Sequence, residues 1–109
     1  MCIRDSNTAF GKNALLSNTT ATVNTAVGRD ALKTNTTGGS NTAVGHGALQ
    51  ANTTANDNVA VGREAMYTNT TGTENTAVGH DALYSNTTAN SNSASVSYTH
   101  LTLPTNREV

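Results

Sequence analysis

The sequence predicts a repeat solenoid, specifically a parallel β-solenoid of 17-residue coils, each holding one short strand and one short helical turn. Three observations predict this fold class. Segments that begin at Asn7, Asn24, Asn41, Asn58 and Asn75 repeat one pattern with no insertion or deletion. The kept apolar residues form two short clusters, Ala-Val-Gly and Ala-Leu, which are too few to order a single copy alone. Charged residues fall only at positions that vary between copies, as expected of a solvent-facing surface.

Each copy begins with Asn-Thr-Ala-Val-Gly, which predicts a short strand that ends at glycine. Thr42 and Val44 would face one side of this strand and Ala43 the other, because side chains alternate along a strand. Glycine then allows a corner, through a positive φ or through close approach of another backbone. The corner glycines are Gly28, Gly45, Gly62 and Gly79.

The segment after the glycine, such as residues 29–34, holds mostly good or tolerable helix formers and is too short for an independent helix. It predicts one or two turns of helix. An asparagine follows, where a left-handed cap would suit that residue, and Thr-Thr with Gly or Ala then forms the loop to the next strand. The asparagines expected at this second corner are Asn35, Asn52, Asn69 and Asn86.

Stacked coils would place equivalent residues in columns about 4.8 Å apart, the spacing of paired strands. The first asparagine of each copy is expected to form an amide ladder that satisfies corner backbone groups. These are Asn24, Asn41, Asn58 and Asn75. Strand and helical face would meet in a core of Val27, Leu32, Val44, Leu49, Val61, Met66, Val78 and Leu83. Such a core is thin, so the alanine face of the strand is expected to be covered by self-association around a shared axis.

Residues 1–6 and 95–109 do not follow the period. A codon string that encodes residues 1–5 has a reverse complement that encodes residues 96–100, which is a property of DNA and not of a fold. Both ends resemble a translated sequencing adaptor, and we expect them to be non-native read-through. Residues 7–94 are then five repeats and the start of a sixth, cut from a longer array. Because Cys2 is the only cysteine, the repeats hold no disulfide and no cysteine-bound zinc.

Composition excludes several classes of function. Only 12% of the residues are charged and the formal net charge is −1, which does not favour nucleic acid or an anionic membrane surface. No apolar run approaches the roughly 20 residues that span a bilayer, so this segment is not expected to insert into a membrane. No cofactor, metal or catalytic residue is predicted, because a regular rod offers no pocket for an oriented nucleophile and base.

The NTAVG segment followed by ALxxNTTG resembles the head and stalk repeats of trimeric autotransporter adhesins. It is also similar to repeat arrays of phage tail fibres and bacterial surface proteins. The resemblance covers residues 7–94. It implies a homotrimer outside a cell or on a virion, acting as a stalk or as an adhesive head that contacts a host surface or receptor. We therefore expect a structural and adhesive fibre module without enzymatic activity.

Some single motifs allow a specific functional interpretation as well as an ordinary structural one. His46 and His80 share a column with Arg63 between them, which argues against a shared metal site. Each Asn-Thr-Thr triplet satisfies the glycosylation rule, although the same residues suit a turn. Tyr67 and Tyr84 are adjacent in one column and could stack. The alternative function is binding of ice or another surface through the threonine columns, as in some antifreeze solenoids.

Overall fold

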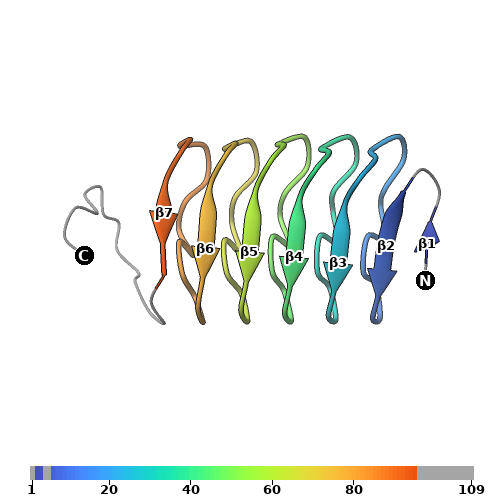
Figure 1. Ribbon diagram of the computed structural model, residues 1–109, viewed down its shortest axis with the longest axis horizontal. Coiled ribbons are helices and arrows are strands. Elements are labelled where there is room, and N and C mark those ends of the chain that lie inside the picture. The colour runs from blue at the N-terminus through green and yellow to red at the C-terminus, as the bar shows by residue number, and fades with distance from the viewer. Residues whose placement is uncertain (1, 4–5, 96–109) are drawn as a thin grey trace.

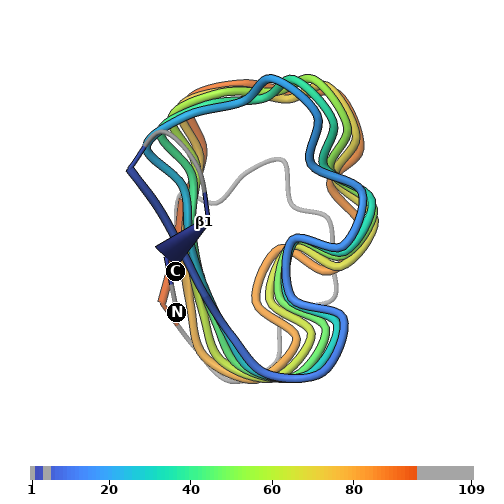
Figure 2. The ribbon, with the colours of Figure 1, turned by 90° about the vertical axis from the view of Figure 1, so that its right-hand side faces the viewer.

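The structure is a computed structural model, and it describes residues 2–3 and 6–95. The chain winds into successive coils that stack along one axis (Figures 1 and 2), with principal-axis extents of 40 × 20 × 16 Å. We number the coils 1 to 5 from residues 7, 24, 41, 58 and 75, and the positions within a coil 1 to 17. Much of the two expected read-through segments lies outside the described residues.

One strand of each coil joins a single sheet that runs along the rod (Figure 1). The described strands are β1 (Cys2–Ile3), β2 (Asn7–Phe10), β3 (Thr25–Val27), β4 (Thr42–Val44), β5 (Val59–Val61), β6 (Thr76–Val78) and β7 (Ser93–Ala94). From β2 to β7 they pair in parallel with a register of 17 residues, so that Ala26 lies beside Ala43, whereas β1 pairs with β2 antiparallel. The predicted parallel β-solenoid of 17-residue coils is confirmed.

The expected helical turn is wrong in detail, because the described residues contain no helix. Three consecutive turns take its place, the first closed by Ala31 N–H donating to Gly28 C=O at 3.2 Å. Asp30 and Leu32 have left-handed φ angles of 62° and 50°. This alternation aims backbone groups along the rod, so that Leu32 N–H donates to Ala48 C=O of the next coil at 3.0 Å. In a helix, these backbone N–H groups would instead donate to carbonyl groups of the same coil.

The predicted glycine corners have the expected backbone. Gly28, Gly45, Gly62 and Gly79 have φ between 130° and 134°. A Cβ built on Gly45 would lie 2.5 Å from the carbonyl oxygen of Gly62 and 2.6 Å from its carbon. Glycine is therefore required here both for its φ and for the approach of the next coil.

The second predicted corner is built differently from expectation. Asn35, Asn52, Asn69 and Asn86 are absent from the residues with positive φ, and the left-handed role falls to positions 7, 9 and 17. The asparagine side chains turn inward instead, and the first three are fully buried. Asn52 Nδ2 donates to Asn35 Oδ1 at 2.8 Å and to Ala55 C=O at 3.1 Å. This column is an amide ladder, which satisfies groups that a solvent-facing cap would have left to water.

The asparagines at position 1 form a second column, bonded to backbone. Asn24 Oδ1 accepts the backbone N–H of Asn41 at 2.8 Å, and Asn41 Nδ2 donates to Ala55 C=O across its own coil at 2.8 Å. The same pair of bonds recurs at Asn58 and Asn75. Each carboxamide thus ties its coil to a neighbour and closes its own loop.

The core corrects the predicted orientation of the strand. Ala43 is fully buried in it, together with Ala48 and Leu49 of the same coil. Val27, Val44, Val61 and Val78 lie outside it on the other side of the sheet, where Val78 is 44% exposed. The strand and the turn segment lie close together, so the alanine methyl group at position 3 fills the space opposite the leucine at position 9. Leu32 and Met66 are also fully buried, and Leu83 packs partly buried against the same core.

Candidate functional site

The exposed side of the sheet is a regular surface that runs along the rod. It carries positions 2 and 4 of the strands β2 to β6, and we call it the outer sheet face. Neighbouring strands place equivalent side chains about 4.8 Å apart, and the two positions are about 6.7 Å apart along one strand. Phe10, at position 4 of coil 1, is 68% exposed. The two columns are Thr8, Thr25, Thr42, Val59 and Thr76, and Phe10, Val27, Val44, Val61 and Val78.

A carboxylate with several partners lies at the corner after the glycine of coil 2. Asp30 Oδ1 accepts a hydrogen bond from Asn13 Nδ2 of the preceding coil at 2.8 Å. Arg29 Nε lies 3.3 Å from Asp30 Oδ2, Lys33 Nζ 3.8 Å from Oδ1, and His46 Nε2 4.0 Å from Oδ2. The hydrogen bond from Asn13 lowers the pKa of Asp30 most; burial opposes it, and the charges of Lys33, Arg29 and His46 add to the lowering.

We expect Asp30 to make the rod sensitive to acid. Folding lowers the pKa of Asp30, so its ionised carboxylate stabilises the folded state. This stabilisation is fully present above the unfolded carboxyl pKa of about 3.9 and is lost as pH falls through the lower folded value. Urea unfolding of the wild type and of Asp30→Asn at a series of pH values should show that the free energy of unfolding falls less steeply with decreasing pH in the variant. Asp57→Asn, at an exposed site, serves as control. Parallel declines in all three proteins would contradict the assignment.

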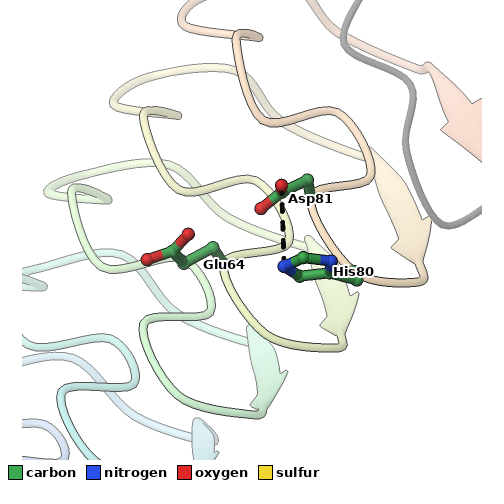
Figure 3. Close-up of side chains that lie close together, drawn as sticks. All are labelled: Glu64, His80 and Asp81. Atoms are coloured by element: carbon green, nitrogen blue, oxygen red, sulfur yellow. Dashed lines mark ion pairs between the residues drawn. The ribbon is translucent and has the colours of Figure 1, made fainter.

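A different group meets at the equivalent corner between coils 4 and 5 (Figure 3). His80 Nε2 lies 3.6 Å from Asp81 Oδ2, and Glu64 brings a carboxylate from the preceding coil. One ligand-type atom from each of the three side chains lies within 4.8 Å of the others. Asp81 Oδ1 is buried and has no hydrogen-bond partner. The sequence pattern singled out His80 at this corner but neither Asp81 nor Glu64, although the 17-residue period places these two carboxylates side by side.

The two histidines that the structure describes, His46 and His80, do not come together. His46 lies beside Asp30 and His80 beside Asp81, at separate corners of the rod. Tyr67 and Tyr84 do stack, with ring centroids 5.2 Å apart and an interplanar angle of 17°. Burial raises the pKa of Tyr84 most, and electrostatic interactions with Glu64, Tyr67 and Asp81 add to the rise. The tyrosine pair therefore borders the acidic corner.

The Asn-Thr-Thr triplets have a structural use at each coil. The asparagine nitrogen that would carry a sugar donates within the buried ladder at Asn52 and Asn69. The first threonine also bonds between coils, as in Thr36 Oγ1, which donates to Thr53 C=O at 3.2 Å. These observations favour the turn reading over glycosylation, because attachment would break the ladder. They also leave the outer sheet face as the better candidate for a repetitive binding surface.

Comparison of the chain with models of protein families, with curated proteins and with solved structures finds no match. Within residues 2–3 and 6–95, no helical segment has the length and apolar character needed to cross a membrane.

Proposed function

We propose that the chain is a structural and adhesive module of a fibre, a stalk or head displayed outside a cell or on a virion, with no catalytic activity of its own. The observation that carries this proposal is the continuity of its columns. Asn24, Asn41 and Asn58 pass the same hydrogen bond from coil to coil, and Asn35, Asn52 and Asn69 do so in a neighbouring column. A chain held together by contacts between neighbouring coils extends by addition of further coils, as a spacer requires.

The same proposal includes a homotrimer assembled around a shared axis through the outer sheet face. The alanine face, which was expected to need this cover, is already buried inside the single chain. This face presents an apolar column, from Phe10 to Val78, that the single chain leaves partly or largely exposed. Burial of apolar area is the main driving force of protein association. Three copies that meet through these columns would thicken a narrow rod and leave positions 6 and 10 available for weak contacts with a host surface or receptor. Position 7, also expected to face solvent, is buried at Asp30 and Gly47 and half-buried in the other coils.

A second candidate function is binding of ice or of another ordered surface. The observation that favours it is the Thr-x-Val pattern of β3, β4 and β6, which sets hydroxyl and methyl groups in a two-dimensional array. Such an array can hold water in a fixed pattern that matches a crystal face. The two functions compete for the same surface, because a trimer would bury it and ice binding needs it free.

Sedimentation equilibrium and thermal hysteresis of the full chain separate the two functions. We expect a trimer with no effect on ice growth, and we expect Val44→Asp to convert it to a folded monomer by placing a charge in the apolar contact. Gln50→Lys is the matched control, since Lys33 occupies the same position in coil 2. A monomer with thermal hysteresis would support the ice reading, and a monomer without it would contradict both proposals.

A further inference from the structure

One corner of the solenoid gathers metal-ligand side chains from two coils (Figure 3). His80 and Asp81 come from coil 5, and Glu64 reaches the same place from coil 4. The side chain of His80 is half exposed and that of Asp81 is one-quarter exposed, so an ion can enter from solvent. The period creates this meeting, because residues 17 apart lie side by side in stacked coils.

The corner contains a buried oxygen that the side chains around it leave unsatisfied. Between coils 1 and 2, Asn13 Nδ2 donates to Asp30 Oδ1 at 2.8 Å. Between coils 4 and 5, Glu64 occupies the position equivalent to Asn13, and an ionised carboxylate has no proton to donate. Asp81 Oδ1 is accordingly buried without a hydrogen-bond partner. A cation is the group that would satisfy both carboxylates at once.

We propose that Glu64, His80 and Asp81 bind a divalent transition metal ion, and that zinc fits their donor set. Zinc accepts imidazole nitrogen and carboxylate oxygen at about 2.0–2.2 Å, with water completing the coordination. Two ligand atoms on one ion are then at most about 4.4 Å apart. The three atoms lie within 4.8 Å of one another, so small side-chain rotations bring them to that distance. The imidazole disfavours calcium and magnesium, which take oxygen ligands.

The related corner at Asp30 differs in a way that supplies a control. Arg29 and Lys33 already lie beside Asp30, and Asn13 occupies its Oδ1. His46 therefore contacts a carboxylate that other side chains neutralise. Histidine and aspartate are present at both corners, and the second carboxylate is present only at Asp81.

Calorimetric titration of zinc chloride into the chelator-treated, untagged full chain tests the proposal, in a Cys2→Ser background that removes the single thiol. We expect one zinc ion per chain. His80→Ala should weaken binding roughly tenfold or more, whereas His46→Ala should bind as the parent does. Cobalt(II) should give visible absorption bands of a four- or five-coordinate ion that His80→Ala removes. Absence of zinc binding by the parent, or equal loss in both histidine variants, would overturn the site.

Glu64→Asn separates loss of a ligand from loss of the fold. It reproduces the Asn13–Asp30 pair, and the φ of 57° at Glu64 is one that asparagine tolerates. We expect the metal-free melting temperature to rise while zinc affinity falls roughly tenfold or more. Unchanged zinc affinity in this variant would show that the ion, if bound, is held elsewhere.

Discussion

Replacement of Gly45 by alanine is expected to unfold the centre of the solenoid. The φ of Gly45 is 134°, and its new Cβ would lie 2.5 Å from the carbonyl oxygen of Gly62. The backbone cannot withdraw locally, because Gly45 N–H donates to Val27 C=O at 2.7 Å and Gly62 N–H donates to Val44 C=O at 2.7 Å. Backbone strain and overpacking together should cost roughly 2 to 6 kcal/mol, a large share of the stability of a small domain.

Urea unfolding followed by circular dichroism measures this loss. Gly47→Asn is the matched control, because Gly47 also has a left-handed φ of 72° but its Cβ would meet only the side chains of Glu64 and Tyr67, at 3.3 and 3.4 Å. Asn13 occupies the same position in coil 1 with a φ of 64°. We expect a change within about 1 kcal/mol. Similar losses at Gly45 and Gly47 would show that φ, and not the approach of the next coil, selects glycine.

The period alone was enough to predict the stacking of coils, because parallel strands in register are the simplest arrangement that places residues 17 apart side by side. The glycine corner followed from the same pattern. The inward face of the strand did not follow, since Thr-Ala-Val offers two faces and the larger apolar residue was assigned to the interior. The signal was present: position 3 is alanine in every copy, whereas position 4 accepts Phe10 as well as valine. A narrow interior tolerates no such change in volume.

The turn segment could not be predicted from helix propensity, because propensity describes a backbone that satisfies its own donors. In the solenoid, Asp30 N–H and Leu32 N–H donate to the preceding and following coils respectively, at 2.9 and 3.0 Å. Position 7 carried a usable signal, since Asn13, Asp30 and Gly47 are residues that tolerate left-handed φ. Leucine at position 9 gave no sequence signal for a left-handed φ. Burial of its side chain offsets the backbone strain, and this burial becomes visible only when the coils are stacked.

The acidic corner illustrates the same limit for a candidate site. Glu64 and Asp81 are 17 residues apart, so their proximity could have been predicted from the period. That Asp81 Oδ1 is buried, while Asp30 Oδ1 receives a hydrogen bond, depends on the turn geometry and on which residue precedes each aspartate by one coil.

Replacement by aspartate should have opposite consequences for folding in two apolar columns, the leucine column at position 9 and the valine column at position 4. Leu49 is fully buried between Leu32 and Met66. Leu49→Asp removes its packing and leaves a charge without a partner in the interior, which should cost more than about 4 kcal/mol and unfold the chain. The backbone does not cause this loss, because aspartate tolerates the φ of 52° at this position better than leucine does. Leu49→Met, which copies Met66, should cost less than about 1.5 kcal/mol.

Val44→Asp should leave the coil folded, although valine and leucine are similar in size and Val44 is only five residues away. Val44 lies on the outer sheet face beside Val27 and Val61, outside the core. Its substitution should cost about 1 kcal/mol or less in the monomer, measured as the urea midpoint by circular dichroism at a concentration where sedimentation shows a single chain. If Val44→Asp unfolds the protein as Leu49→Asp does, the valines support the interior after all, and the alanine-lined core described for this solenoid is wrong.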